Sequence, residues 1–98
     1  MWHIVLHYVE SMILVRGLVW DDWNKEHIYR HGVSIKEVEE VCHGKYDVIE
    51  SYRKRIQIVG KTKNGKTIII IISPEDRKLK AYGKGIYYPI TAFEKEDL

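Results

Sequence analysis

The pattern of apolar and polar positions in the first half of the chain predicts a strand followed by two short helices. Residues Met12–Trp20 are mostly apolar, which is typical of a strand. The Asp21–Asp22 pair offers an N-cap for a helix that ends at Gly32, because a carboxylate accepts hydrogen bonds from first-turn amides and glycine ends helices readily. Ser34-Ile35-Lys36-Glu37 has the capping-box form and begins a second helix, which ends at Gly44. So short a connection predicts that the helices pack as a tight corner.

The second half of the chain alternates in the way that is typical of strands. The pattern predicts them at Asp47–Tyr52, Lys54–Lys61, Thr67–Ile72 and Ile86–Ala92. Asn64-Gly65 predicts a hairpin, because both residues tolerate positive φ. The unbroken isoleucines of Thr67–Ile72 predict a central strand covered on both faces. Pro89 has no amide hydrogen to donate, so we expect the last strand at an edge of the sheet or with a bulge, and a short helix is one option for the tail Phe93–Leu98.

These elements predict an α+β fold in which two short helices pack on an antiparallel sheet of about four strands. The 98 residues fit a single domain, and a composition of 45% hydrophobic and 31% charged residues is globular rather than disordered. Within 1–98 we distinguish an N-terminal extension or extra strand at 1–11, a core at 12–92 and a short tail at 93–98. The one cysteine, Cys42, cannot form an internal disulfide, and the longest apolar run is too short for a membrane span. We therefore expect a cytoplasmic protein.

The net charge of +2 is mildly basic, and the cations cluster at 53–55, 61–66 and 77–84. Such a distribution permits contact with nucleic acid without requiring it. Arginine offers a planar fork for phosphate, and tyrosine offers a face on which an unpaired base can stack. The residues with this chemistry are Arg53, Arg55 and Gln57 on one strand face, and Tyr82, Tyr87 and Tyr88 near the last strand. Together they would hold RNA, whereas the alternative is solvated arginines with tyrosines packed against the helices.

Other chemistry has weaker support in the sequence. His27 and His31 lie four residues apart on the first helix, and a zinc site would add Cys42 or His43. The metalloprotease motif requires glutamate directly after the first histidine, whereas here Glu26 precedes it. The sequence contains no glycine-rich loop that opens a helix and no motif around a nucleophile. We therefore predict neither a metal site nor a cofactor.

The helical block has a distinctive set of residues: Trp20-Asp21, Asn24, His27, Arg30-His31-Gly32-Val33-Ser34 and Glu37-Val38-Glu39-Glu40-Val41. With this set it resembles the opening of the BrnT toxin family. The similarity covers about 18–92, and the family's Arg-aromatic-aliphatic-x-Ile-Gly strand is similar to Arg55–Gly60, with Lys61 as the basic residue that follows.

The resemblance implies a RelE-like fold and the toxin of a type II toxin–antitoxin pair, which cuts RNA without a metal. It also implies a BrnA-like ribbon-helix-helix antitoxin as partner and contact with DNA only through that antitoxin. No membrane association is expected, because the apolar runs are short. Arg55 is carried over first, as a phosphate or transition-state contact. Lys61 comes second, and Arg30 and His31 third. With the residues of the basic strand face and the last strand added, the full set is catalytic Arg55, Lys61, His31 and Tyr88, with RNA-binding Arg30, Arg53, Gln57 and Tyr87.

The last strand departs from the family pattern. The family commonly reads Arg-Ile-Ile-Ser-Ala-Arg, whereas this chain has Tyr88-Pro89-Ile90-Thr91-Ala92-Phe93. Loss of two guanidinium groups removes charge stabilisation, which Tyr87 or Tyr88 would replace in part as acid, base or stacking group. The alternative hypothesis is therefore a divergent, non-catalytic member that binds protein or RNA.

Overall fold

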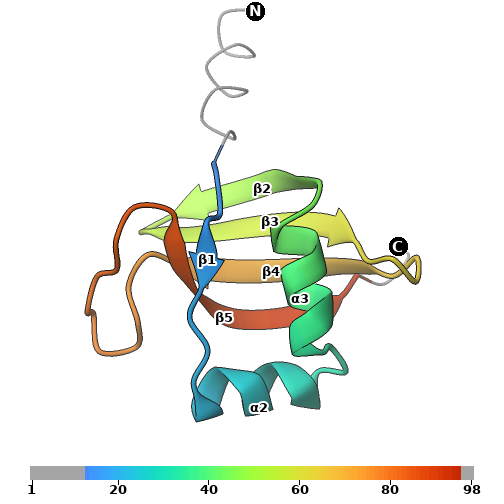
Figure 1. Ribbon diagram of the computed structural model, residues 1–98, viewed down its shortest axis with the longest axis horizontal. Helices are drawn as coiled ribbons and strands as arrows, with labels where there is room; N and C mark the ends of the chain where they lie inside the picture. Colours follow the sequence, from blue (N-terminus) through green and yellow to red (C-terminus); the bar gives the residue numbers. More distant parts are fainter. Residues whose placement is uncertain (1–12, 96–98) are drawn as a thin grey trace, which may run out of the picture.

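A five-stranded mixed sheet with two helices on one of its faces forms the protein (Figure 1). The computed structural model describes residues 13–95, without the side chains of 50–52. The elements in chain order are β1 (Gly17–Leu18), α2 (Asp22–Arg30), α3 (Ile35–Cys42), β2 (Tyr46–Tyr52), β3 (Arg55–Lys61), β4 (Thr67–Ser73) and β5 (Ile86–Glu94). The strand order in the sheet is β1-β5-β4-β3-β2. Among the described residues, no helix is long and apolar enough to cross a membrane.

The predicted α+β class and both helices are confirmed, whereas the purely antiparallel sheet of about four strands is wrong. The additional strand is β1, which pairs parallel to β5 through Gly17↔Ile86 and Leu18↔Tyr87. Within 13–20, the described part of this predicted strand, only Gly17 and Leu18 form a strand, and the chain leaves the sheet after the Val19 N–H donates to the Tyr87 carbonyl (2.9 Å). Residues 1–11, expected as an extension or extra strand, lie outside the described part.

Both helices begin with a capping box. Asp21, not Asp22, caps α2: its carboxylate accepts from the Asn24 amide (2.9 Å), and the Asn24 side-chain oxygen accepts from the Asp21 amide (2.8 Å). Ser34 caps α3 as predicted, with the Glu37 side chain returning to the Ser34 amide (3.0 Å). Gly32 links the helices at a φ of 81°, a conformation that glycine adopts without strain. The tight corner therefore follows from local chemistry.

The core lies between the helices and one face of the sheet. Register places Ile58, Ile70 and Ala92 in one row across β3, β4 and β5, and all three are fully buried. The helices cover them with Ile28, Val38 and Val41, which are also buried. α3 approaches β3 closely at Gly60, where an added Cβ would lie 2.5 Å from the Val41 Cγ1.

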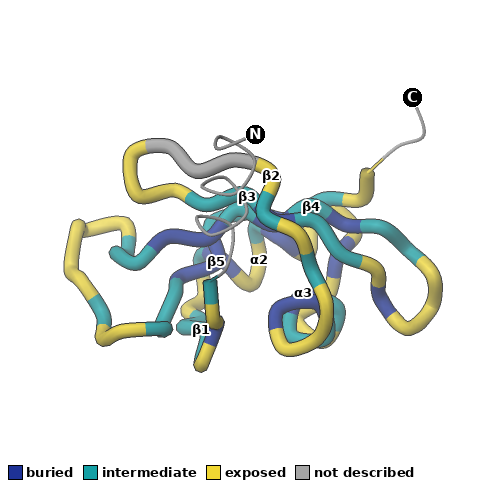
Figure 2. Tube along the Cα trace, turned by 90° about the horizontal axis from the view of Figure 1, so that it is seen from above, coloured by how far each residue is buried: buried dark blue, intermediate teal, exposed yellow. Residues whose placement is uncertain are grey.

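The opposite face of the sheet carries no helix within the described part of the chain (Figure 2). β4 is central as predicted, but Ile69 and Ile71 on this open face are only half-buried, so residues 13–95 do not provide the predicted cover on both faces. β5 lies between β1 and β4, and a register shift opposite Pro89 accommodates the proline, which confirms the bulge rather than the edge. Phe93 and Glu94 belong to β5, so a helical tail is wrong there, and 96–98 lie outside the described residues.

Candidate nucleic-acid interface

β3 presents its polar side chains on the open face of the sheet. Ile56, Ile58 and Gly60 pair with the isoleucines of β4 that face the helices, so alternation directs Arg55, Gln57 and Lys61 to the other side, as predicted. Arg55 and Lys61 are exposed, and Gln57 is half-buried. The first two can meet the phosphates of a strand lying along β3, and the amide of Gln57 can donate to or accept from a base edge or ribose.

Arg55 and Lys61 nevertheless stand at opposite ends of β3. Six residue steps at about 3.4 Å each separate their Cα atoms by roughly 20 Å. The two cations can therefore contact different phosphates of one strand but do not converge on a single scissile group. The prediction that Arg53 shares the strand face of Arg55 and Gln57 is wrong, because Arg53 lies in the β2–β3 turn before β3 begins, is exposed and has a φ of 50°.

The predicted helical residues lie near the Lys61 end. Arg30 is the last residue of α2 and stands 4.0 Å from the Glu26 carboxylate, while His31 is the exposed C-cap. The next carbonyl, that of Gly32, accepts from the Lys66 ammonium (3.2 Å), which places this corner beside the β3–β4 hairpin. Arg30 and His31 are therefore not brought together with Arg55.

Tyr88 lies in the interior, 1% exposed. Its hydroxyl is 3.0 Å from both carboxylate oxygens of Asp21 and donates to this group. Burial raises the pKa of Tyr88, and the hydrogen bond to Asp21 raises it further, so the phenol stays protonated at neutral pH. Tyr87 is half-buried and packs against the core. The buried ring of Tyr88 therefore offers no free face for a stacked base, and for this residue the alternative of packing against the helices is correct.

A column of rings runs along α2. The rings of Trp23 and His27 stack at 4.7 Å, the His31 ring meets His27 edge-on at 5.0 Å, and the Arg77 guanidinium lies 4.2 Å above the Trp23 ring centroid. Burial lowers the pKa of His27, and the neighbouring His31 and Arg30 lower it further. The spacing of four residues predicts that Trp23, His27 and His31 share a helix side, but nothing local indicates Arg77 as the partner. Sequence reasoning therefore missed this link between α2 and the β4–β5 loop.

The histidines do not assemble a metal site within residues 13–95, where no group of three or more potential ligands comes together. His43 is instead bonded to Glu39 (2.8 Å) on α3. The thiol of Cys42 is buried in the core, and burial, with a smaller contribution from Glu39, raises its pKa to about 12. Cys42 therefore acts as a small apolar side chain, as predicted.

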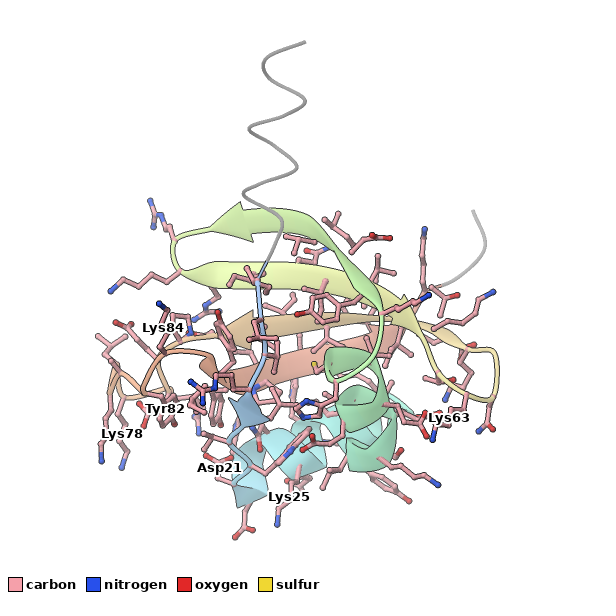
Figure 3. All side chains as sticks on the ribbon, turned by 45° about the horizontal axis from the view of Figure 1, so that its top comes forward. Asp21, Lys25, Lys63, Lys78, Tyr82 and Lys84 are labelled. Carbon is pink, nitrogen blue, oxygen red and sulfur yellow. The ribbon has the colours of Figure 1, made fainter. Side chains whose placement is uncertain are left out.

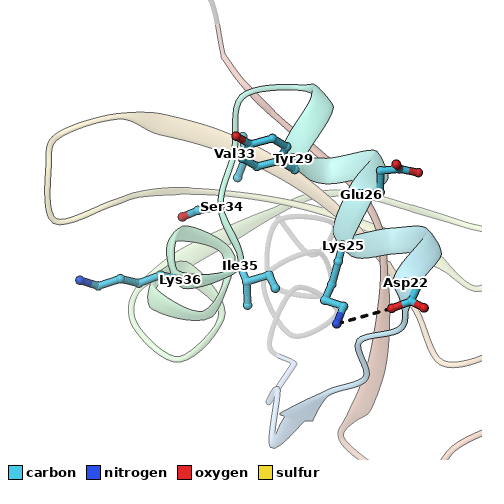
Figure 4. Close-up of a pocket in the computed structure, with 8 residues that line it drawn as sticks. All are labelled: Asp22, Lys25, Glu26, Tyr29, Val33, Ser34, Ile35 and Lys36. Atoms are coloured by element: carbon cyan, nitrogen blue, oxygen red, sulfur yellow. Dashed lines mark ion pairs between the residues drawn. The ribbon is translucent and has the colours of Figure 1, made fainter.

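A cleft of about 520 Å³ opens between α2 and α3 (Figure 4). Val33 is buried at this cleft, whereas Tyr29 and Ile35 are exposed. An ion pair between Lys25 and Asp22 (3.8 Å) lies at the side. The cleft is thus built by the helices, while Arg55 and Gln57 belong to the face of the sheet turned away from them.

Comparison with protein families, with curated proteins and with solved structures finds no match for this chain.

Proposed function

We propose that this protein acts on RNA as a BrnT-like toxin, a metal-independent endoribonuclease of a type II toxin–antitoxin system in the cytoplasm. The observation that carries the proposal is the position of Arg55 and Gln57, with Lys61 further along, on the sheet face that the helices leave uncovered. In metal-independent cleavage the ribose 2′-hydroxyl gives its proton to a base or to water and attacks the adjacent phosphorus. The bond to the 5′-oxygen breaks, and that oxygen takes up a proton, which leaves a 2′,3′-cyclic phosphate and a 5′-hydroxyl. A fixed guanidinium beside that phosphate stabilises the additional negative charge of the transition state.

Cleavage by purified protein tests the proposal. RNA and translating ribosomes are incubated with the protein in the presence of EDTA, and products are read at nucleotide resolution. Arg55→Ala should slow cleavage by about 100-fold, the usual loss for one transition-state donor, without lowering stability, because Arg55 is exposed. Lys36→Ala is the matched control, since it removes an exposed cation from α3 on the helical side of the sheet. Intact RNA, together with normal growth on expression, would refute the activity.

The partner belongs to the same proposal. A toxin of this class requires an antitoxin, which we propose to be a small ribbon-helix-helix protein whose complex with the toxin contacts operator DNA. Support would come from a short reading frame for such a protein beside the gene and from its co-purification with this chain. The absence of both would count against the toxin assignment but not against cleavage of RNA.

A non-catalytic module that binds RNA or protein is the second candidate, and a specific observation favours it. The proposed catalytic residues do not converge, because Arg55 and Lys61 lie at opposite ends of β3, His31 lies at the hairpin corner and Tyr88 is buried. In addition, Phe93 lies opposite Ile69 on the open face, at the position where the resembled family has its second arginine. RNA binding without any cleavage would select this candidate, whereas cleavage that Arg55→Ala abolishes would eliminate it.

A further inference from the structure

Two segments that are distant in sequence meet at one end of the sheet. The β2–β3 turn and the β4–β5 loop both extend from the end at which β3 begins and β4 finishes (Figure 1). An ion pair joins them, with the Lys54 ammonium 2.8 Å from the Glu75 carboxylate. Figure 2 shows both segments as exposed tube at the same end of the molecule.

This end of the sheet concentrates positive charge. Segments 53–55 and 74–85 contain seven Lys or Arg residues and two carboxylates, a net charge of +5, whereas the whole chain carries +2. Both carboxylates are engaged, because Glu75 pairs with Lys54 and Asp76 accepts from the backbone amides of Lys78 (2.9 Å) and Lys80 (2.8 Å). These amides, the Lys80 amide most, lower the pKa of Asp76 and keep it ionised within the loop. Both carboxylates therefore have partners within these two segments, whose net charge remains +5.

The lysines of the loop are exposed and, in the part of the chain that the structure describes, their ammonium groups form no ion pair or hydrogen bond. They are Lys78, Lys80 and Lys84. Figure 3 shows Lys78 and Lys84 near Tyr82 at this end and Lys63 at the opposite end of the sheet. These lysines are not an isolated group of charges, because the loop projects from the same end of the sheet that carries Arg55.

The conformation of the loop is held by its own hydrogen bonds. The Asp76 amide donates to the Lys80 carbonyl (2.9 Å), and the Tyr82 amide donates to the Pro74 carbonyl (3.0 Å). The Arg77 guanidinium over the Trp23 ring fixes the loop to α2. A loop held in this way loses little conformational entropy when it binds, which favours binding at modest charge.

We propose that this basic end, formed by Arg53, Arg55, Arg77, Lys78, Lys80 and Lys84, binds the sugar-phosphate backbone of a single RNA strand beside Arg55. The identity of the ligand as RNA rests on the proposed function, and the basic end extends that function by naming the surface that holds the backbone flanking the contacted phosphate. A single strand is required because the 2′-hydroxyl can align with the leaving oxygen only where the nucleotides are free to unstack. The loop lysines lie outside the set of residues that the sequence resemblance indicates.

The test is the salt dependence of RNA binding by the full chain. Fluorescence anisotropy with a labelled single-stranded RNA of about 16 nucleotides gives Kd between about 50 and 200 mM salt. Substitution of Lys78, Lys80 and Lys84 together by Gln removes three phosphate contacts. The slope of log K against log salt should then fall by about 2, and affinity should fall by at least about tenfold. The corresponding triple substitution by Arg keeps the charge and should bind like the wild type.

The matched control substitutes Lys25, Lys36 and Lys63 by Gln, which removes the same charge from exposed positions elsewhere. An equal loss in control and loop variants would show that only net charge matters and would overturn the proposal, as would unchanged binding by the loop variant. If RNA is bound through the loop but never cut, the basic end stands and the ribonuclease function fails. If RNA is cut in an Arg55-dependent manner and the loop variant binds and cuts normally, the reverse holds.

Discussion

The buried Asn24 connects three parts of the fold, and its substitution should be costly. The side chain is fully buried, and its amide nitrogen donates to the carbonyls of Val19 and Pro89, both at 3.0 Å. Its oxygen accepts from the Asp21 amide (2.8 Å) as part of the capping box of α2. One side chain therefore holds the end of the β1 segment, the start of α2 and the proline of β5 together.

Asn24→Asp is the informative perturbation because it changes the chemistry at nearly constant volume. The carboxylate keeps the cap but loses both donors, so two carbonyls lose their partners at about 1–3 kcal/mol each. A total loss of about 2–6 kcal/mol is expected, a large part of the roughly 5–15 kcal/mol that stabilises a domain. Burial beside carbonyl oxygens raises the pKa of the new carboxyl. Because the folded state then holds its proton more tightly than the unfolded state, the loss should shrink as pH falls.

Urea unfolding followed by tryptophan fluorescence at about pH 7 and pH 4.5 measures both effects. Asn64→Asp makes the same chemical change in the exposed β3–β4 turn and should stay within about 0.5 kcal/mol of the wild type. The reasoning is refuted if Asn24→Asp is as stable as this control at neutral pH, or if its deficit does not shrink in acid.

The remaining predictions concern packing and titration. Gly60→Ala should destabilise the protein by about 1–3 kcal/mol in urea unfolding, because the new Cβ would lie 2.5 Å from the Val41 side chain. Gly83→Ala, where an added Cβ has nothing within 4 Å, should have little effect. Equal stability of the two variants would contradict the close approach of α3 to β3. Burial lowers the pKa of His27 from 6.5, so the contribution of neutral His27 to stability should be fully present above that pH and decline below it. His27→Gln should reduce this acid-induced fall in the thermal unfolding temperature. An unchanged pH profile would exclude His27 as its source. Cys42, with its pKa raised to about 12, should react with a thiol reagent only as the chain unfolds, and rapid labelling in native buffer would contradict its burial.

Features that depend on neighbouring residues were predictable from the sequence. The Ser34–Glu37 capping box and the Asn64-Gly65 hairpin signal involve residues at most a few positions apart, so their chemistry is complete within the segment. The hairpin is confirmed, although only Gly65 of the pair has a positive φ (89°). The alternation that turns Arg55 away from Ile58 is equally local, because a strand has a period of two. The sequence by itself therefore determined the α+β class, the helix starts and the face of β3 on which Arg55 stands.

Tertiary structure decided which of these segments meet. A period of two gives the face of a strand but not the end at which it meets other residues, so Arg55 and Lys61 share a face while standing roughly 20 Å apart. The hydroxyl of Tyr88 reaches Asp21 across 67 positions, and local patterns contain no information about such a contact. The same holds for the parallel pairing of β1 with β5 and for the joining of segments 53–55 and 74–85 at one end of the sheet. These arrangements arise only when the whole core is packed, because strand order and helix cover are set by burial of all apolar faces at once.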